Sequence, residues 1–423
     1  MTRLMALSFL GILGSFHACT AGAADPALEH ARRLLARQPI IDGHNDLPWA
    51  IHEKTGALGD LDALDLRLRT DGDTDLERLA AGGVGGQFWS VYVPTNLGHG
   101  TIRQQLEQID LARRMIARYP DRLALATTAA DVERIMRRGR VASLLGIEGG
   151  HAIENSLGVL RAYSRLGVSY MTLTHSASLD WADSSSGKPR NGGLTPFGEE
   201  VVREMNRLGM LVDLSHTSVE TMEDALRVAE APVIFSHSSA RALCDHPRNV
   251  PDAILRQLPE NGGLVMITFV APFISPAYAT ASRPLWAEFE KRTKGIEDST
   301  RRRRIWREIK ARLPPIRVTV GDVADHIDHV RRVAGVDHVG LGGDYDGNDS
   351  WPEGLQDVST YPTLFAELIR RGWSDGDLAK LANGNILRVM RRVEAVAARM
   401  QRERPASTAT IDVLDGGRAG GRR

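Results

Sequence analysis

The chain has 423 residues, more than one ordinary hydrophobic core organises, so two domains or one large α/β barrel is expected. Hydrophobic residues make up 42% of the chain and charged residues 25%, which is typical of a soluble globular protein. The 53 basic residues balance the 53 acidic residues, so the net charge gives no reason to expect nucleic acid or an anionic membrane as a partner.

The segment 1–24 has the pattern of a secretory signal peptide. Arg3 precedes an apolar stretch from Leu4 to Phe16, and the small residues of 21–24 contain an A-x-A cleavage pattern. The apolar stretch is too short to span a membrane in the mature chain. We therefore predict export to the periplasm or the exterior. Lipid attachment at Cys19 is disfavoured, because the tripeptide before it is a poor match to such a site.

The cysteine content fits the same destination. Cys19 and Cys244 are the only cysteines of the chain. Removal of the signal peptide leaves Cys244 alone, so we expect no disulfide within the mature chain. Export without disulfides suits a bacterial periplasm.

Eight short apolar or β-branched runs recur along the chain and predict strands. They cover residues 39–42, 87–93, 141–147, 170–174, 211–215, 232–236, 264–269 and 338–342. Helical patterns lie between them, at residues 102–118, 130–137, 156–166, 196–208, 218–228, 250–258 and 320–333. This alternation predicts parallel βαβ units, and eight of them predict a (β/α)8 barrel of the TIM type. An open doubly wound sheet is the alternative, but its G-x-G-x-x-G turn is absent after the first run.

Two stretches exceed the usual loop length. The stretch 56–79 is rich in aspartate, and we expect it to cross the mouth or the end of the barrel. The stretch 271–318 separates strands seven and eight, and its part 286–312 is strongly charged and helical in pattern. Long excursions of this kind are typical of lids, subsites or oligomer contacts. The basic run Arg301–Arg304 indicates a solvated helix face rather than a nucleic-acid patch.

We expect residues 25–400 to form one catalytic domain. The segment 401–423 is rich in Gly, Arg, Ala and Thr and has no apolar end, so it is predicted to be a disordered tail.

Six of the eight predicted strands end in a metal ligand or an acid–base group. His44 and Asp46 follow the first run, and side chains two apart in a strand point the same way. Barrels of this type carry their chemistry at the carboxyl ends of the strands. The other strand ends carry Glu148, His175, His216, His237 and Asp344. The coincidence predicts a metal centre.

The types of ligand restrict the metal. Imidazole and carboxylate without thiolate favour zinc, with manganese, cobalt or iron as alternatives. Five of these residues acting as ligands would be too many for one tetrahedral ion that keeps a water. Five ligands suit two ions about 3.5–4 Å apart. Glu148 lies among glycines that leave room for close approach, so it is the predicted bridge between the two ions.

These residues lie in motifs that resemble the renal (membrane) dipeptidase family of zinc-dependent dipeptidases, over about residues 30 to 395. The matching motifs are Asp42–Pro48, Gly146–His151, Leu173–Ser176, Val212–His216, Phe235–Ala240, Arg248–Val250 and Gly342–Gly347. The resemblance implies a (β/α)8 barrel with two zinc ions that hydrolyses free dipeptides. One ion would be held by His44 and Asp46, the other by His216 and His237, with Glu148 between them. Family members are often dimers, which is compatible with a homodimer here.

The resemblance also implies residues that handle the substrate, namely His175, Arg248 and Asp344. Asp344 can hold the free ammonium and move a proton, and His175 can stabilise the oxyanion, so these two are the predicted catalytic residues. Arg248 offers a planar fork to the C-terminal carboxylate. Two alternatives stay open. The first is another metal hydrolase on the same barrel, such as a lactonase, imidase or deaminase, and the second is a binding protein without catalysis.

Overall fold

The computed structural model describes residues 25–55, 59–95, 100–296 and 298–416. The predicted signal peptide, with Cys19, lies outside the described residues. Among the helices in these ranges, none combines the length and the apolar character that a membrane crossing requires. Cys244 is buried.

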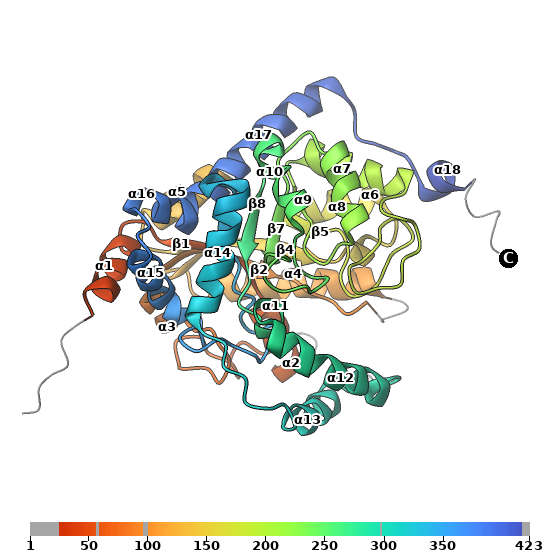
Figure 1. Cartoon of the computed structure of the whole chain (residues 1–423). Helices are drawn as coiled ribbons and strands as arrows, with labels where there is room; N and C mark the ends of the chain where they lie inside the picture. The colour runs from red at the N-terminus through yellow and green to blue at the C-terminus, as the bar shows by residue number, and fades with distance from the viewer. Residues whose placement is uncertain (1–24, 56–58, 96–99, 297, 417–423) are drawn as a thin grey trace, which may run out of the picture.

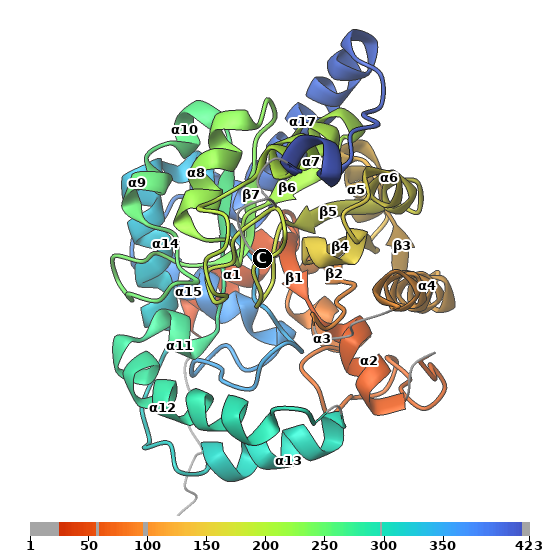
Figure 2. The ribbon, with the colours of Figure 1, turned by 90° about the vertical axis from the view of Figure 1, so that its right-hand side faces the viewer.

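Eight parallel strands form a closed barrel, which confirms the predicted (β/α)8 fold (Figure 1 and Figure 2). Strand β9 pairs back with β1 and closes the ring, with Asp42 opposite Leu341. The strands in order around the barrel are β1 (Ile40–Asn45), β2 (Val84–Ser90), β4 (Val141–Glu148), β5 (Val168–Thr172), β6 (Leu211–Asp213), β7 (Ile234–Ser238), β8 (Leu264–Ile267) and β9 (Val339–Leu341). Each of them overlaps one predicted run.

A short ninth strand, β3 (Leu123–Leu125), lies beside the barrel. It pairs with the first residues of β4, at Val141–Ser143, whereas β5 pairs with β4 from Leu145 onward. The two strands therefore share one edge of β4, and β3 extends the sheet without entering the ring. Sequence analysis missed it because three residues are too few to show a strand period.

Helices surround the barrel (Figure 1). On the amino-terminal half they are α1 (Pro26–Leu35), α2 (Leu47–Thr55), α3 (Leu76–Ala81), α4 (Thr101–Arg118), α5 (Ala129–Met136), α6 (Leu157–Arg165), α7 (Pro196–Leu208) and α8 (Val219–Val228). They continue with α9 (Asp252–Leu255), α10 (Leu258–Asn261), α11 (Ala271–Ile274), α12 (Pro276–Thr293), α13 (Ser299–Lys310), α14 (Val320–Ala334), α15 (Tyr361–Arg370), α16 (Asp375–Ala379), α17 (Asn385–Glu403) and α18 (Ile411–Asp415).

The helix bounds follow local signals in the sequence. Helix α7 has the predicted bounds because the Thr195 side chain caps its first turn, Pro196 starts it and Gly209 ends it at a φ of 77°. The predicted helix at 250–258 is instead two short helices, α9 and α10. Pro259 falls at the start of α10, where its missing N–H costs nothing, but it prevents one continuous helix.

Helix α17 closes the amino-terminal end of the barrel. Its apolar face, including Val389 and Val393, packs in one core cluster with side chains from inside the barrel such as Phe88 and Leu144. The Asn385 side chain donates hydrogen bonds to the carbonyls of Val336 and Val339, at 2.7 Å and 2.8 Å, and fixes the helix to β9. The carboxyl end is left as the open end.

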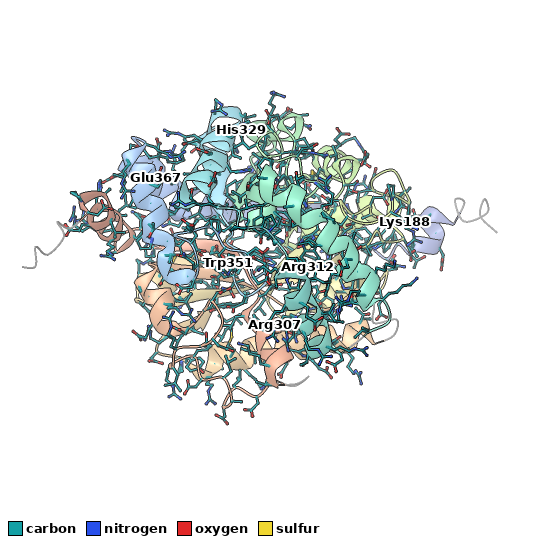
Figure 3. All side chains as sticks on the ribbon, turned by 60° about the horizontal axis from the view of Figure 1, so that its bottom comes forward. Lys188, Arg307, Arg312, His329, Trp351 and Glu367 are labelled. Atoms are coloured by element: carbon teal, nitrogen blue, oxygen red, sulfur yellow. The ribbon has the colours of Figure 1, made fainter. Side chains whose placement is uncertain are left out.

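The predicted helical insertion between the seventh and eighth barrel strands is a hairpin formed by α12 and α13. It projects from the side of the molecule opposite α17 (Figure 1). Arg307, on α13, and Arg312, just after it, are exposed (Figure 3). The run Arg301–Arg304 is only partly the solvated face that we predicted, because Arg303 pairs with Glu53 on α2 at 2.8 Å.

The segment after α17 is ordered where the sequence predicted a disordered tail. Helix α17 extends to Glu403, and α18 packs against α7. The Asp415 carboxylate accepts hydrogen bonds from the Thr195 hydroxyl at 2.6 Å and from the Phe197 N–H at 3.1 Å. Tertiary contacts, rather than helix propensity, therefore hold this part of the chain. Residues 417–423 lie outside the described residues.

The acidic stretch 56–79 crosses the barrel mouth in its described part. Asp73 and Asp346 each donate a backbone N–H to the other's carboxylate, both at 2.9 Å. Nearby, the Asn45 amide donates to the Thr74 hydroxyl at 2.9 Å. Asp346 follows β9 and Asn45 ends β1, so these bonds fix the stretch to the carboxyl ends of two barrel strands.

This paired contact predicts how stability depends on pH. Burial and the neighbouring Asp346 carboxylate raise the pKa of Asp73 from 3.8 to about 7. The unfolded chain releases the Asp73 proton near pH 4 and the folded chain near pH 7. The contribution of this proton to the free energy of unfolding is therefore full below pH 4 and is lost as the pH rises to about 7. Asp73→Asn removes that loss but keeps an acceptor for the Asp346 N–H.

We predict that the free energy of unfolding falls less between pH 5 and pH 8 in Asp73→Asn than in wild type. Urea denaturation of the metal-free proteins measures it, with Asp121→Asn at an exposed position as control. Identical pH profiles for wild type and Asp73→Asn would contradict the prediction.

Candidate functional site

The structure brings all eight predicted site residues together at the carboxyl end of the barrel. His44 and His237 lie within strands β1 and β7, and Glu148 ends β4. The other five follow strand ends or lie in the loop after β7, and they are Asp46, His175, His216, Arg248 and Asp344. A cavity of about 710 Å³ reaches these five and Glu148, while the two strand histidines lie deeper and are fully buried.

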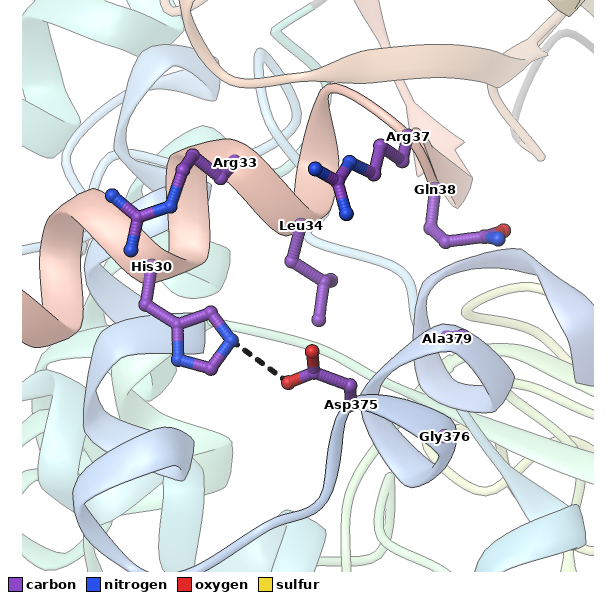
Figure 4. A pocket seen from close by; sticks show the side chains of 8 residues that line it. All are labelled: His30, Arg33, Leu34, Arg37, Gln38, Asp375, Gly376 and Ala379. Carbon is purple, nitrogen blue, oxygen red and sulfur yellow. Dashed lines mark ion pairs between the residues drawn. The ribbon is translucent and has the colours of Figure 1, made fainter.

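A second cavity, of about 460 Å³, lies between α1 and α16 (Figure 4). Its walls carry an ion pair between His30 and Asp375, 2.8 Å long, and none of the eight site residues. It has no part in the chemistry described below.

The Glu148 carboxylate is the centre of the cluster. Its Oε2 faces His44 Nε2 at 3.6 Å. Its Oε1 faces Nε2 of His216 at 3.0 Å and of His237 at 3.4 Å. The two oxygens therefore face different imidazoles. This is the arrangement that a carboxylate needs to bridge two cations.

Other donors extend the cluster on both sides. Asp46 Oδ2 lies 3.2 Å from His44 Nε2, and His175 Nε2 lies 3.7 Å from Glu148 Oε1. Three overlapping triplets have donor atoms within 4.8 Å of one another, namely His44–Glu148–His237, Glu148–His175–His216 and His44–Asp46–Asp344. Because the triplets overlap, they do not by themselves divide the donors between two ions.

Hydrogen bonds fix the orientation of the His44 ring. The Tyr170 hydroxyl donates to the Gly43 carbonyl at 3.3 Å and lies 2.8 Å from His44 Nδ1. A hydroxyl has one proton, so Tyr170 accepts the Nδ1–H of His44. This assigns the tautomer in which the Nε2 lone pair is free and faces Asp46 and Glu148. The position of Tyr170 requires Gly146, because a Cβ there would lie 2.0 Å from the tyrosine ring.

A hydrogen bond also assigns the tautomer of His237. Asp213 is fully buried and accepts a hydrogen bond from the Ser236 hydroxyl at 2.6 Å. That hydroxyl lies 2.8 Å from His237 Nδ1 and therefore accepts its proton. The Nε2 lone pair of His237 is then directed at Glu148. Partners of this kind fix the tautomer and the ring angle of metal-binding histidines.

Backbone features allow the carboxylates to approach one another. A Cβ at Gly347 would lie 2.2 Å from Asp46 Oδ2 and 2.5 Å from Asp344 Oδ1, so only glycine fits there. His216 and Asp344 have φ values of 65° and 67°, a left-handed conformation that is strained for residues with a side chain. Strain of this kind is concentrated at functional sites.

The electrostatics of the site favour bound cations. Burial lowers the pKa of His44, but the carboxylates of Asp46 and Glu148 outweigh burial and raise that pKa to about 10. The two carboxylates thus strongly favour a positive charge beside them, which a divalent ion would supply. Burial and the charge of His44 lower the pKa of His237 to about 3. His237 is therefore neutral, the form in which histidine binds metal.

Arg248 and Asp344 lie on the cavity wall with opposite charge preferences. Arg248 is only 4% exposed. It donates to the His237 carbonyl at 3.1 Å, and its guanidinium lies 5.3 Å from the Phe273 ring centre. Burial raises the pKa of the Asp344 carboxyl well above its ordinary value. The cavity wall therefore carries both a fixed cation and a group that readily takes a proton.

Sequence analysis missed several residues of the site. Tyr170 and Ser236 lie inside predicted strands, where they look like ordinary core positions. Asp42 is fully buried and accepts hydrogen bonds from the Gly343 N–H and the Tyr361 hydroxyl, at 2.7 Å and 2.5 Å, which hold the loop that carries Asp344. Their roles depend on which strands the closed barrel makes adjacent, and a single run of sequence carries no signal of that.

Residues 28–404 match the model of one protein family, described as membrane dipeptidase, peptidase family M19. Dipeptidase 3 of Mus musculus is 43% identical over 381 residues, which are 88% of this chain and 68% of that protein. Dipeptidase verJ of Clonostachys rogersoniana is 43% identical over 389 residues, 89% of this chain and 90% of that protein. The chain belongs to the membrane dipeptidase family.

Solved structures agree with membership in the membrane dipeptidase family. The probable dipeptidase PvdM of Pseudomonas aeruginosa has a TM-score of 0.75 and 25% identity, covering 88% of this chain and 99% of that chain. The metallopeptidase named dipeptidase AC has a TM-score of 0.67 and 25% identity, covering 84% and 98%. The prediction of a metal-dependent dipeptidase, a hydrolase of peptide bonds, is confirmed and favoured over another hydrolase on the same barrel.

The hydrogen bond between Tyr170 and His44 generates a prediction for this dipeptidase. Tyr170→Phe keeps the ring but removes the oxygen that fixes the His44 tautomer, so we expect divalent-metal affinity to fall by about 10- to 100-fold. Competition with a fluorescent zinc chelator measures the affinity. Tyr119→Phe is the matched control, because the Tyr119 hydroxyl bonds to the Leu66 N–H and to Asp65 rather than to a residue of the site. Equal affinity of wild type and Tyr170→Phe would contradict the assigned tautomer.

Proposed function

We propose that this chain hydrolyses free dipeptides with two zinc ions, one held by His44 and Asp46 and the other by His216 and His237. Glu148 bridges the two. The single observation that carries the proposal is the division of the Glu148 oxygens between His44 on one side and His216 and His237 on the other. The donor set fits zinc, because it combines neutral imidazoles and carboxylates without thiolate.

When bound, the two ions would lower the pKa of a water to about 7 and polarise the peptide carbonyl. The carboxylates of Asp46 and Glu148 supply part of the negative charge that this pair of ions requires. Tyr170 and Ser236 keep the imidazoles of His44 and His237 in the tautomers that leave Nε2 free. The protein residues thus prepare the site before substrate arrives.

Asp344 has two roles in the proposal. Its carboxylate binds the free ammonium of the dipeptide, and it takes the proton of the attacking water. Burial raises the pKa of Asp344 well above the ordinary value, so it accepts a proton more readily than an exposed aspartate would. It can then give the proton to the leaving amine. General acid–base catalysis of this kind contributes about 10²–10⁴-fold in rate.

In the proposal, His175 stabilises the oxyanion. It lies on the cavity wall beside Glu148, and burial lowers its pKa, so the ring is neutral with one N–H to donate. A donor aimed at the developing oxyanion is worth about 3–4 kcal/mol in a site that excludes water.

Arg248 recognises the C-terminal carboxylate of the substrate. Two of its guanidinium nitrogens contact Ser238 and the His237 carbonyl, and its buried Nε has no hydrogen-bond partner within the described ranges. The side chain is held in place but retains donors for a carboxylate. Binding of both charged ends by Arg248 and Asp344 restricts the substrate to a dipeptide.

We also propose that the protein is exported through the signal peptide at 1–24. The composition of that segment supports the proposal. A homodimer is compatible with membership in the family.

Assays with Ala-Ala and its blocked analogues test the function. We predict that chelator treatment abolishes hydrolysis and that zinc restores it. N-acetyl-Ala-Ala and Ala-Ala-amide each lose one charged end, so kcat/KM for them should fall by at least about thirtyfold, since an unpaired buried charge costs about 2–5 kcal/mol.

The variant Arg248→Met tests carboxylate recognition, and Arg256→Met is its control. Arg248→Met should narrow the difference between Ala-Ala and Ala-Ala-amide, whereas the exposed Arg256→Met should not. Equal activity of stripped and zinc-loaded enzyme would contradict the metal mechanism. Equal cleavage of free and blocked dipeptides would contradict recognition of the two ends.

A further inference from the structure

Two tryptophans of the α12–α13 hairpin form an aromatic wall on the catalytic cavity. The rings of Trp286 and Trp306 stack with centroids 4.2 Å apart and planes inclined by 27°. Phe289 packs edge-on against both rings, at 5.6 Å and 5.4 Å. Both tryptophans line the same cavity as Glu148 and Asp344, whereas Phe289 lies behind them. The catalytic site therefore continues outward to an apolar surface.

The aromatic wall is partly exposed to solvent. Trp286 is 43% exposed, which makes it one of the few large hydrophobic side chains of the described residues with such exposure. An exposed aromatic surface inside a cavity is typical of a ligand-binding site. The cavity of about 710 Å³ lies within the range that holds drug-sized ligands, so it has room beyond a dipeptide of two small residues.

Contacts on both rims hold the wall in position. Arg303 on α13 pairs with Glu53 on α2 at 2.8 Å. On the other rim, the Trp306 Nε1–H donates to Asp349 at 2.8 Å, and Lys310 pairs with the same carboxylate at 2.8 Å. The rings are thus preorganised. The charges of Arg303 and Lys310 beside the rings are each paired with a carboxylate.

The position of the wall indicates which end of the substrate it meets. Asp349, which anchors Trp306, lies in the loop that also carries Asp344. Other side chains cover Arg248. Phe273 packs over its guanidinium, and the His246 ring packs on Phe273 with centroids 4.5 Å apart. Under the proposed function, Asp344 binds the ammonium. The contact of Trp306 with the loop of Asp344 therefore favours the N-terminal residue as the part of the substrate that meets the wall.

We propose that Trp286 and Trp306 form a subsite for a large aromatic side chain on the N-terminal residue of the dipeptide. This inference rests on the proposed function for the assignment of the substrate ends. Stacking on an aromatic pair, together with burial of the side chain, corresponds to about a tenfold preference. The subsite favours dipeptides such as Trp-Ala or Phe-Ala over Ala-Trp or Ala-Phe.

The test compares kcat/KM for Trp-Ala, Ala-Trp and Ala-Ala in wild type and Trp286→Ala. The ratio of Trp-Ala to Ala-Ala should fall by about tenfold in the variant, and the ratio of Ala-Trp to Ala-Ala should change by less than twofold. Leu106→Ala removes a side chain that is similarly exposed, at 42%, on α4 outside the cavity, so it should change neither ratio. An unchanged Trp-Ala ratio, or an equal fall in both ratios, would overturn the proposal.

Binding to the metal-free full-length protein separates this inference from the proposed function. Isothermal titration should show that Trp286→Ala binds Phe-Ala about tenfold more weakly than wild type, with no such difference for Ala-Phe. If wild type fails to hydrolyse any dipeptide but shows this difference in binding, the proposed function is wrong and the subsite is right. If Phe-Ala binds equally to both proteins, the subsite is wrong whatever the activity.

Discussion

The Glu148 carboxylate, buried at the end of β4, is the constraint around which the site is organised. Imidazoles from three other strands or strand ends face its two oxygens at 3.0–3.6 Å. A buried carboxylate is costly unless positive charge compensates it. The raised pKa of His44 shows this demand in the protein alone. Two metal ions would meet the same demand and would turn an electrostatic cost into a catalytic centre.

The barrel makes this convergence possible. Parallel strands place residues that are distant in sequence at one end. Helix α17 closes the other end, and Glu148 lines the cavity at the mouth. Buried hydrogen bonds then orient two of the converging histidines. Tyr170 orients His44, and Asp213 acts on His237 through Ser236. The α12–α13 hairpin adds an outer wall to the cavity.

The sequence was sufficient to predict the barrel and the donors at its mouth. Each strand is a local run, and His44, Glu148 and His216 follow such runs directly. Arg248 was different, because it lies on a loop well past β7 and only the family resemblance identified it. Tyr170 and the contact between Trp286 and Trp306 could not be predicted, because both depend on packing between distant segments.

Two structural details were also beyond sequence patterns. Strand β3 is three residues long, too short for a period to emerge. Helix α18 is a five-residue helix that depends on the contact of Asp415 with α7, whereas composition alone predicted disorder. In both cases tertiary contacts decide the structure of segments whose local preference is weak.

Anomalous X-ray scattering at the zinc edge, from crystals of the zinc-loaded protein, tests the central role of Glu148 most directly. Our account predicts two peaks on either side of the Glu148 carboxylate, one bound by His44 and Asp46 and the other by His216 and His237. A single peak would contradict it, and so would two peaks that place His216 and His237 on different ions.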